Sequence, residues 1–194
     1  MKTIITVIFF GILTYAVAVA NGQCQNSLQP KKDLIVKDFF KNSWFVTHMK
    51  DGTKEAACRE YKTKLEENDS VIKLNADGEY TFKEQKKFYT TICSSTKGRP
   101  LNPAAGPFVL HCRHTYEKDK SNIFFELKLS VIDTDYSNYA LVYRCTKYDD
   151  TSLNLNYGNF LLLHRSKSGN GSKATTSLQK NQLSLNQFKK TAGC

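Results

Sequence analysis

The sequence lacks the short motifs of catalysis and of metal binding. It contains no G-x-S-x-G, H-E-x-x-H or P-loop pattern, and its cysteines form no C-x-x-C pair. Its basic residues are scattered, with no run of five or more and no RNP-like aromatic motif. We therefore expect neither an enzyme nor a zinc, redox or nucleic-acid site, and no cofactor.

Long apolar runs are also absent after the first twenty residues. Lys2, the apolar stretch from Ile4 to Leu13 and the small residues Ala18-Val19-Ala20 have the order of a signal peptide. No later segment approaches the roughly 20 apolar residues that a membrane-spanning helix needs. The pattern predicts a signal peptide over residues 1–20 and one secreted, monomeric domain over residues 21–194.

All six cysteines lie after the predicted signal peptide, at positions 24, 58, 93, 112, 145 and 194. An even number in an exported chain favours three disulfides, although six cysteines allow 15 pairings. Cys24 and Cys194 suggest that bridges hold both ends of the domain. Asn68 and Asn170 begin N-x-S sequons and are predicted N-glycosylation sites.

The formal net charge is +10. Such a charge favours anionic partners, namely carboxylate or phosphate ligands, acidic protein surfaces or lipid headgroups. The alternative is that the charge serves solubility alone.

Short runs rich in β-branched and aromatic residues recur between turn residues, which is typical of all-β folds. Asp77-Gly78 predicts a tight hairpin with positive φ, and residues 177–190 have the spacing of a short helix. Eight antiparallel strands remove their free edges by closing into a barrel whose interior is just wide enough for one small ligand. The expected strands are residues 44–50, 58–65, 70–75, 79–93 as one long bent strand, 108–116, 123–132, 139–147 and 158–165.

Three separate segments resemble the lipocalin family. The first runs from Asp38 to Val46 and includes Trp44, with Ser43 where the family usually has Gly. The second begins Thr134-Asp135-Tyr136, at the turn before the seventh strand, and the third ends in Arg165. The resemblance implies an eight-stranded up-and-down barrel with Arg165 on the Trp44 indole, a cation–π contact worth on the order of 0.5 to 2 kcal/mol. These residues are therefore expected to be structural.

Within the lipocalins, the segments Cys58–Thr63, Phe45–His48 and Tyr139–Lys147 resemble the triabin-like salivary proteins of blood-feeding bugs, of the pallidipin, triplatin and leukotriene-binding type. That resemblance implies a calycin fold and a protein that scavenges small mediators of haemostasis or inflammation, although some members bind clotting proteases. It also implies the disulfides Cys24–Cys145, Cys58–Cys194 and Cys93–Cys112.

Period-two alternation suggests which side chains face the cavity. If Cys58 points outward, Arg59 and Tyr61 point inward, and an inward Arg59 needs an anion from a side chain or a ligand. A structural ion pair or an outward Arg59 is the alternative. Tyr139 and Tyr143 share a face that suits an amphiphilic ligand or ordinary core packing. Other expected lining residues are Val46, His48, Phe125, Leu127 and Leu129.

The sequence thus predicts a carrier of an anionic eicosanoid of the thromboxane class, which would inhibit platelet aggregation and vasoconstriction. Haem is excluded as a cofactor because no histidine lies between His48 and His111, where a haem-binding relative would need its ligand. The alternative is an anticoagulant lipocalin that binds a clotting or contact-pathway protein through its basic exterior.

Overall fold

The structure is a computed structural model that describes Cys24 and residues 29–52, 56–153 and 157–194. The predicted signal peptide, residues 1–20, lies outside the described residues. Within the described part of the chain, no helix has the length and apolar character that crossing a membrane requires.

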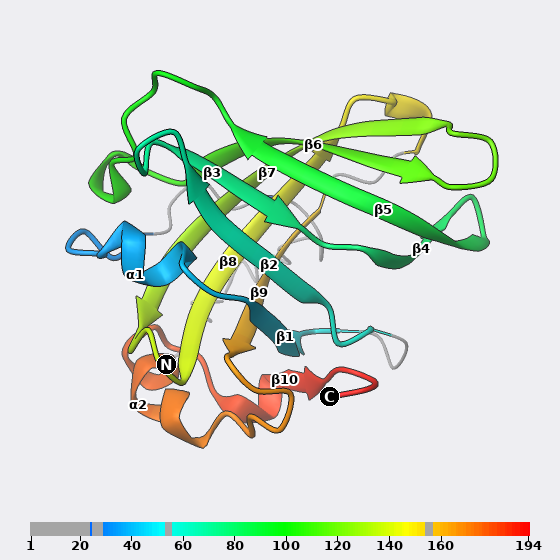
Figure 1. Ribbon diagram of the computed structural model, residues 1–194. Coiled ribbons are helices and arrows are strands. Elements are labelled where there is room, and N and C mark those ends of the chain that lie inside the picture. The colour runs from blue at the N-terminus through cyan, green and yellow to red at the C-terminus, as the bar shows by residue number, and fades with distance from the viewer. Residues whose placement is uncertain (1–23, 25–28, 53–55, 154–156) are drawn as a thin grey trace, which may run out of the picture.

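Eight antiparallel strands form a closed barrel, as the sequence predicts (Figure 1). The first and last of them, β1 and β9, pair along Phe45–Met49, and this pairing closes the sheet. In order around the barrel the strands are β1 (Trp44–Lys50), β2 (Glu60–Glu66), β3 (Val71–Asn75), β5 (Gln85–Ser95), β6 (Phe108–Tyr116), β7 (Asn122–Thr134), β8 (Tyr139–Tyr148) and β9 (Tyr157–His164).

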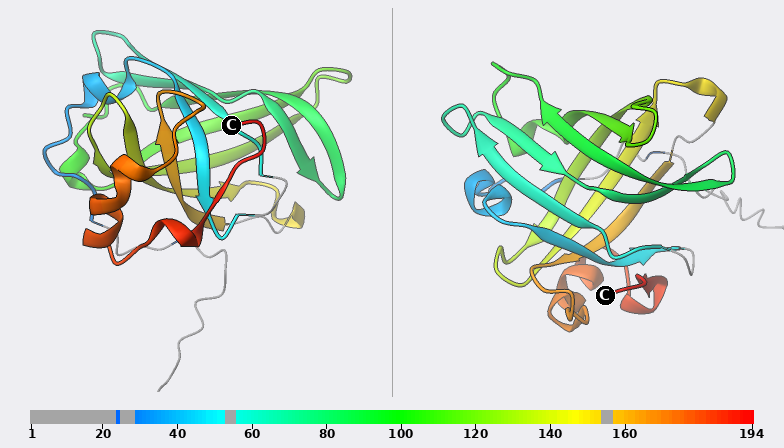
Figure 2. Two further views of the ribbon diagram at one scale, coloured as in Figure 1. Left: turned by 90° about the horizontal axis from the view of Figure 1, so that it is seen from below. Right: turned by 45° about the vertical axis from the view of Figure 1, so that its right-hand side comes forward.

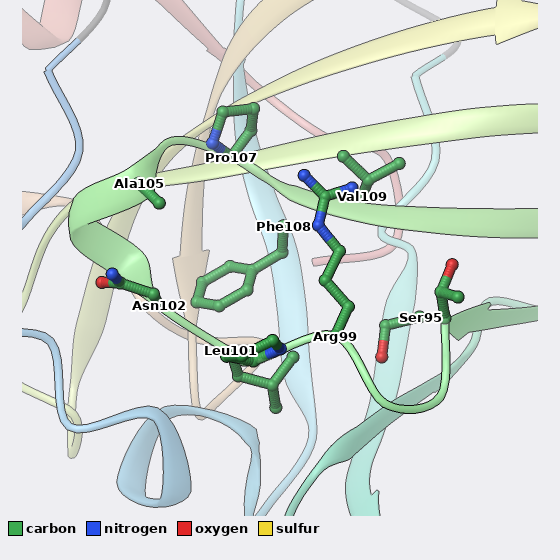
Figure 3. A pocket seen from close by; sticks show the side chains of 10 residues that line it. Ser95, Arg99, Leu101, Asn102, Ala105, Pro107, Phe108 and Val109 are labelled. Atoms are coloured by element: carbon green, nitrogen blue, oxygen red, sulfur yellow. The ribbon is translucent and has the colours of Figure 1, made fainter.

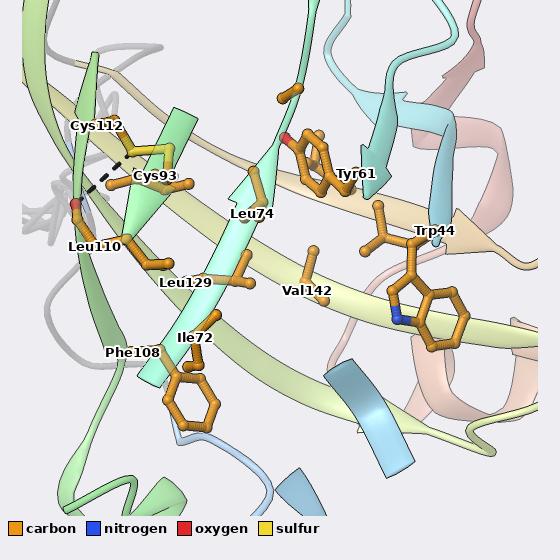
Figure 4. Close-up of a cluster of buried hydrophobic side chains, with 14 of the residues drawn as sticks. Trp44, Tyr61, Ile72, Leu74, Cys93, Phe108, Leu110, Cys112, Leu129 and Val142 are labelled. Atoms are coloured by element: carbon orange, nitrogen blue, oxygen red, sulfur yellow. Dashed lines mark hydrogen bonds between the residues drawn. A yellow bond between two sulfur atoms is a disulfide. The ribbon is translucent and has the colours of Figure 1, made fainter. Parts of the chain in front are cut away.

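The barrel interior is filled by the alternate apolar side chains of these strands. On β7, for example, Phe125, Leu127 and Leu129 face inward and are buried, as expected from the alternation. The helix α1 (Val36–Phe40) covers one end, where Phe40 contacts Phe108 edge to face. Figure 4 shows this interior cluster from Trp44 to the disulfide of Cys93. We call the end under α1 the closed end and the opposite end the mouth.

The expected single strand over residues 79–93 is wrong. The structure has two strands there, β4 (Gly78–Phe82) and β5, joined by a tight turn at Lys83 and Glu84, which have φ of 48° and 64°. This pair lacks the Asn or Gly that usually marks such a turn, so the sequence signal was missing.

The predicted Asp77-Gly78 hairpin is also wrong, although Gly78 has the expected positive φ, 144°. Both β3 and β4 pair with β5, so Asp77-Gly78 interrupts one long strand instead of reversing it.

The predicted helix over residues 177–190 is shorter than expected. Helix α2 (Thr175–Lys180) ends at Lys180 with Asn181 as its C-cap, and Gln182 follows with a φ of 58°. A short 3-10 turn, η4 (Leu185–Gln187), then leads into β10 (Phe188–Lys190), which pairs with β1. Leu178 and Phe188 are buried against the outer face of the barrel. The remaining 3-10 turns are η1 (Pro103–Ala105), η2 (Thr151–Leu153) and η3 (Ser172–Ala174).

The structure contains the three disulfides that the resemblance implies, Cys24–Cys145, Cys58–Cys194 and Cys93–Cys112. The third joins directly opposed residues of β5 and β6 inside the barrel. The first two hold the segments before β1 and after β10 against the barrel wall.

Arg165 holds the closed end together. Its guanidinium lies 3.6 Å from the centre of the Trp44 ring, as predicted. It also donates hydrogen bonds to the carbonyl oxygens of Asp38 and Phe39 in α1, of Asn42 and Ser43 before β1, and of Tyr136 in the turn between β7 and β8. Asp135 shapes that turn by accepting the backbone N–H groups of Asn138 and Tyr139. One side chain therefore joins residues 38–43 and the turn at Tyr136 to the end of β9, although the three segments are distant in sequence.

We predict that Arg165→Met lowers the free energy of unfolding by about 2 to 4 kcal/mol, because several carbonyl groups lose a charged donor at once. Trp44 is the sole tryptophan, so its fluorescence reports urea unfolding directly. Arg165→Lys keeps the charge without the planar fork and should recover less than half of the loss. A loss below about 0.5 kcal/mol in Arg165→Met would contradict this role.

Candidate ligand-binding site

A pocket lies inside the barrel on the side of the mouth. Its walls are apolar and aromatic with a few polar groups, the usual composition of a small-molecule site. The free space is about 30 Å³, which is room for one or two water molecules. The interior is therefore nearly filled in this conformation, in contrast to the ligand-sized space expected from eight strands. The lining residues are Tyr61, Leu74, Ala76, Tyr80, Thr91, Cys93, His114, Phe125, Leu127, Arg144, Thr146, Tyr148 and Tyr157.

Arg144 of β8 is the cation of this pocket. Its Nε donates to Oδ1 of Asn159 at 2.9 Å, and its Nη1 lies 3.4 Å from the hydroxyl of Tyr61. The ring of Tyr157 is 5.3 Å from the guanidinium carbon. Burial acts to lower the pKa of Arg144, but the phenol oxygens of Tyr61 and Tyr157 outweigh it and the pKa lies above its usual value. Among the described residues, no carboxylate forms an ion pair with Arg144.

Arg59 lies at the mouth, just before β2. Its guanidinium donates to the carbonyl oxygens of Asp77 at 3.1 Å and Glu79 at 2.6 Å and stacks 3.9 Å from the centre of the Tyr80 ring. A Cβ atom on Gly78 would lie 2.0 Å from Nη1 of Arg59, so this approach needs glycine. Arg59 thus fixes the break between β3 and β4. The anion that an inward arginine was expected to need is replaced in part by two backbone carbonyl oxygens.

His114 and the phenols of Tyr80 and Tyr148 also belong to the polar lining. Nδ1 of His114 shares a 2.7 Å hydrogen bond with the Thr91 hydroxyl, and its ring stacks on Phe125 at 4.4 Å. Burial and the nearby charge of Arg59 lower the pKa of His114 to about 3, so the ring is neutral at physiological pH. Burial raises the pKa of Tyr80 to about 12 and also raises that of Tyr148. The phenols therefore keep their protons and can donate hydrogen bonds.

Of the residues proposed from the sequence, Tyr61, Phe125 and Leu127 line the pocket and Arg59 stands at its mouth. Whether they bind a ligand stays a prediction. Asn68 and Asn170 are exposed, and their glycosylation likewise stays a prediction.

The expected inward orientation of Tyr139 and Tyr143 is wrong. Both lie outside the barrel, against a second apolar cluster that includes Leu162 and Leu178. The other face of β8, with Arg144, Thr146 and Tyr148, points inward. Cys145 could have shown which face of β8 points inward. Its bridge to Cys24 lies outside the barrel, so its neighbours Arg144 and Thr146 must face the interior.

His48 is also outside the barrel, against expectation. A β-bulge at Thr47 shifts the register of β1, so Val46 faces in while His48 pairs with Leu162 and lies 6.0 Å from His164, ring to ring. The extra residue moves every later side chain of β1 to the opposite face of the strand, and no residue type in β1 indicates the bulge in the sequence.

The chemistry of the pocket suits an anion with an apolar body. The lining contains one guanidinium, several hydroxyl donors and no acidic residue among the described positions. The described residues also contain no group of three or more His, Cys, Asp or Glu side chains that could hold a metal ion.

A second pocket lies on the surface near the closed end, between the loop that contains η1 and the ends of β5 and β6 (Figure 3). Arg99 and Phe108 border it, and its free space is about 60 Å³. Arg99 is exposed there, so the positive charge of this pocket is hydrated, whereas that of Arg144 lies inside the barrel.

Comparison with known proteins gives a consistent result. The family model described as Triabin matches residues 18–178. Triafestin-2 of Triatoma infestans is 36% identical over 168 residues, which cover 85% of this chain and 79% of that protein. Pallidipin of Meccus pallidipennis is 31% identical, covering 97% of this chain and 94% of its own.

Two solved structures share the architecture. The crystal structure of an LTBP1 mutant in complex with leukotriene C4 superposes with a TM-score of 0.62 at 26% identity, covering 89% of this chain and 96% of that one. The tryptamine complex of the amine-binding protein of Rhodnius prolixus has a TM-score of 0.61 at 22% identity, covering 88% and 86%. The second likeness concerns the fold alone.

We predict that His114 makes the protein less stable in acid. Its folded-state pKa of about 3 lies below the usual 6.5, so only the unfolded chain takes up this proton as the pH falls from about 6.5 toward 3. The free energy of unfolding of His114→Gln should therefore depend less on pH than that of the native chain. The difference in free energy of unfolding between the two proteins should shrink by about 2 kcal/mol from pH 7 to pH 4.5. Urea unfolding of both proteins at both pH values measures this. An equal change in the free energy of unfolding of the two proteins would contradict it.

Proposed function

The chain belongs to the triabin family, whose members are binding proteins, and on this premise we propose that it is a secreted salivary lipocalin that sequesters a small anionic mediator. The ligand class that the pocket fits best is the eicosanoids, such as thromboxanes and leukotrienes. Capture of such a mediator would inhibit platelet aggregation and vasoconstriction in the bitten host. The mechanism is stoichiometric, with one protein neutralising one ligand.

Arg144 is the observation that carries this proposal. A guanidinium inside a barrel, with no carboxylate partner among the described residues, is a costly arrangement that an incoming carboxylate would relieve. The Tyr61 hydroxyl beside it supplies a second donor. LTBP1 is described in complex with leukotriene C4, which combines an apolar chain with carboxylates.

The same lining disfavours an amine ligand. A cationic amine needs a carboxylate, which the described lining lacks, and it would be repelled by Arg144 and Arg59. The likeness to the tryptamine complex therefore does not extend to the ligand proposed here.

Entry of a ligand requires side chains to move, because about 30 Å³ is far below the roughly 300 to 1,000 Å³ of ordinary ligand pockets. Among the described residues, strand β4 pairs with β5 alone, so its other edge has no strand partner. Its side chains Tyr80 and Phe82 fill the mouth, where Tyr80 lies 4.2 Å from His114 and Phe82 lies 5.6 Å from Tyr148. We propose that displacement of these two side chains opens the pocket.

A second candidate function is inhibition of a host clotting or contact-pathway protein. The outer face of the sheet exposes Phe88, Ile92 and Phe124 by 52%, 41% and 51%. Ile92 and Phe124 are the cross-strand neighbours of Arg113 on β6, so an exposed cation lies between two apolar side chains. Apolar contact beside an arginine is typical of protein interfaces.

A clotting-time assay beside calorimetric titration with leukotriene C4 and a thromboxane analogue separates the two functions. Heat of ligand binding with unchanged clotting supports sequestration. Prolonged clotting that Phe124→Ser abolishes, with no ligand heat, would replace it by the second candidate.

We predict that Arg144→Met weakens eicosanoid binding by roughly 30-fold, the equivalent of about 2 kcal/mol for a lost hydrogen bond to a charged group. Calorimetric titration measures it, and Arg144→Lys should restore part of the affinity. Arg99→Met removes the same charge from the exposed pocket of Figure 3 and is the matched control. Equal losses in Arg144→Met and Arg99→Met, or none in Arg144→Met, would contradict the assignment.

We further predict that Tyr80→Ala raises the association rate of the same ligand by roughly tenfold, because a filled mouth lowers the population of the binding-competent state. Stopped-flow mixing provides the rate. Tyr80→Phe keeps the ring and loses only the hydroxyl that donates to the carbonyl oxygen of Ala76, so its rate should stay near that of the native chain. An unchanged rate in Tyr80→Ala would show that ligands do not enter past this ring.

A further inference from the structure

The segment after β9 differs in charge from the rest of the chain. Residues 166–194 contain five lysines and no aspartate or glutamate. They thus contribute half of the formal net charge of +10 from less than a sixth of the sequence. We call these residues the basic segment; its lysines are Lys167, Lys173, Lys180, Lys189 and Lys190.

The basic segment covers one side of the barrel. Figures 1 and 2 show α2 and β10 lying along the same side, outside β1, β8 and β9. Leu178 and Phe188 are buried beneath the segment, so its apolar side faces the barrel wall. Its five lysines are all exposed, and the other exposed side chains around them, apart from Ala192, are Ser, Thr, Asn and Gln.

The lysines of this segment have no acidic partners among the described residues. Ten ion pairs occur in that part of the chain, and each uses a lysine outside the segment. Asp51 and Asp135 lie near the segment, because the Asp51 N–H donates to the Gln187 carbonyl and the turn of Asp135 contains Asn138, which accepts from Lys173. Asp51 is paired with Lys50 at 2.6 Å, and Asp135 accepts backbone N–H groups of its own turn. The positive charge of this side is therefore not neutralised within the described structure.

From this arrangement we propose that the basic segment is a binding surface for a linear sulfated polysaccharide of the glycosaminoglycan type. Closely placed sulfates match lysines that have no acidic partner among the described residues, and neutral polar side chains match sugar hydroxyls. Binding there leaves the mouth of the barrel free, so a ligand in the pocket and a polysaccharide on the outer wall can be held together.

Other polyanions fit this surface less well. Anionic membranes are bound best where an apolar side chain inserts, and the exposed large apolar residues of the described chain all lie outside the basic segment. Single-stranded nucleic acid needs exposed aromatic rings for stacking, whereas the aromatic residue of this segment, Phe188, is buried. An acidic protein interface usually contains a central apolar anchor, which this side lacks.

The test is calorimetric titration of the chain with a heparin octasaccharide in 0.15 M NaCl. The triple variant Lys180→Gln, Lys189→Gln, Lys190→Gln should bind at least about tenfold more weakly, since each lysine near a dense anionic surface contributes measurably. The matched control is Lys37→Gln, Lys64→Gln, Lys86→Gln, which removes the same charge from exposed, ion-paired lysines elsewhere. The control should lose less than about threefold in affinity. Circular dichroism of both triples checks that the fold is unchanged.

Equal losses in the two triples would overturn the proposal, because net charge alone would then explain binding. Absence of octasaccharide binding by the native chain at this salt concentration would also overturn it. Two further arms use phosphatidylserine vesicles and a single-stranded oligonucleotide. Binding of either as tight as that of heparin would replace the polysaccharide by a membrane or by unselective polyanion attraction.

Discussion

The pairing of β1 with β9 closes the sheet, and closure forces the inward side chains of eight strands to share one interior. Arg165 and Trp44 hold the closed end, where one guanidinium links α1, the start of β1 and the turn before β8. Along β8 the alternation then leaves Arg144 inside, and apolar walls surround it. The same closed barrel thus holds a structural arginine with five carbonyl partners and a pocket arginine that has no carboxylate partner among the described residues.

The two arginines near the mouth have different roles. Arg59 is held by two carbonyl oxygens and a tyrosine ring and fixes the break between β3 and β4. Arg144 retains capacity for an anion, and the neutral His114 and protonated phenols around it add donors without adding negative charge. The nearly filled interior means that binding is coupled to movement of the wall. A mouth closed by aromatic side chains on a strand paired along one edge makes such movement local, so the rest of the barrel can stay as it is.

The fold was largely predictable from the sequence, and the site only in part. The strands, the Trp44–Arg165 contact and the inward side of β7 follow from period-two alternation and from the family's three segments. His48 was misplaced because the bulge at Thr47 leaves no mark in residue type, and the turn at Lys83-Glu84 lacks the usual Asn or Gly. On β8 both faces are apolar enough to be buried, so alternation alone could not show whether Tyr143 or Arg144 faces the interior. The bridge of Cys145 to Cys24 contained that information.

We propose that Arg144 receives the acidic group of a ligand inside the barrel. A crystal structure of the chain grown with leukotriene C4 tests it most directly. We expect a ligand carboxylate within about 3 Å of the Arg144 guanidinium, with Tyr80 and Phe82 displaced from the mouth. A ligand bound on the outer wall, or an interior still filled by its own side chains at saturating ligand, would contradict it.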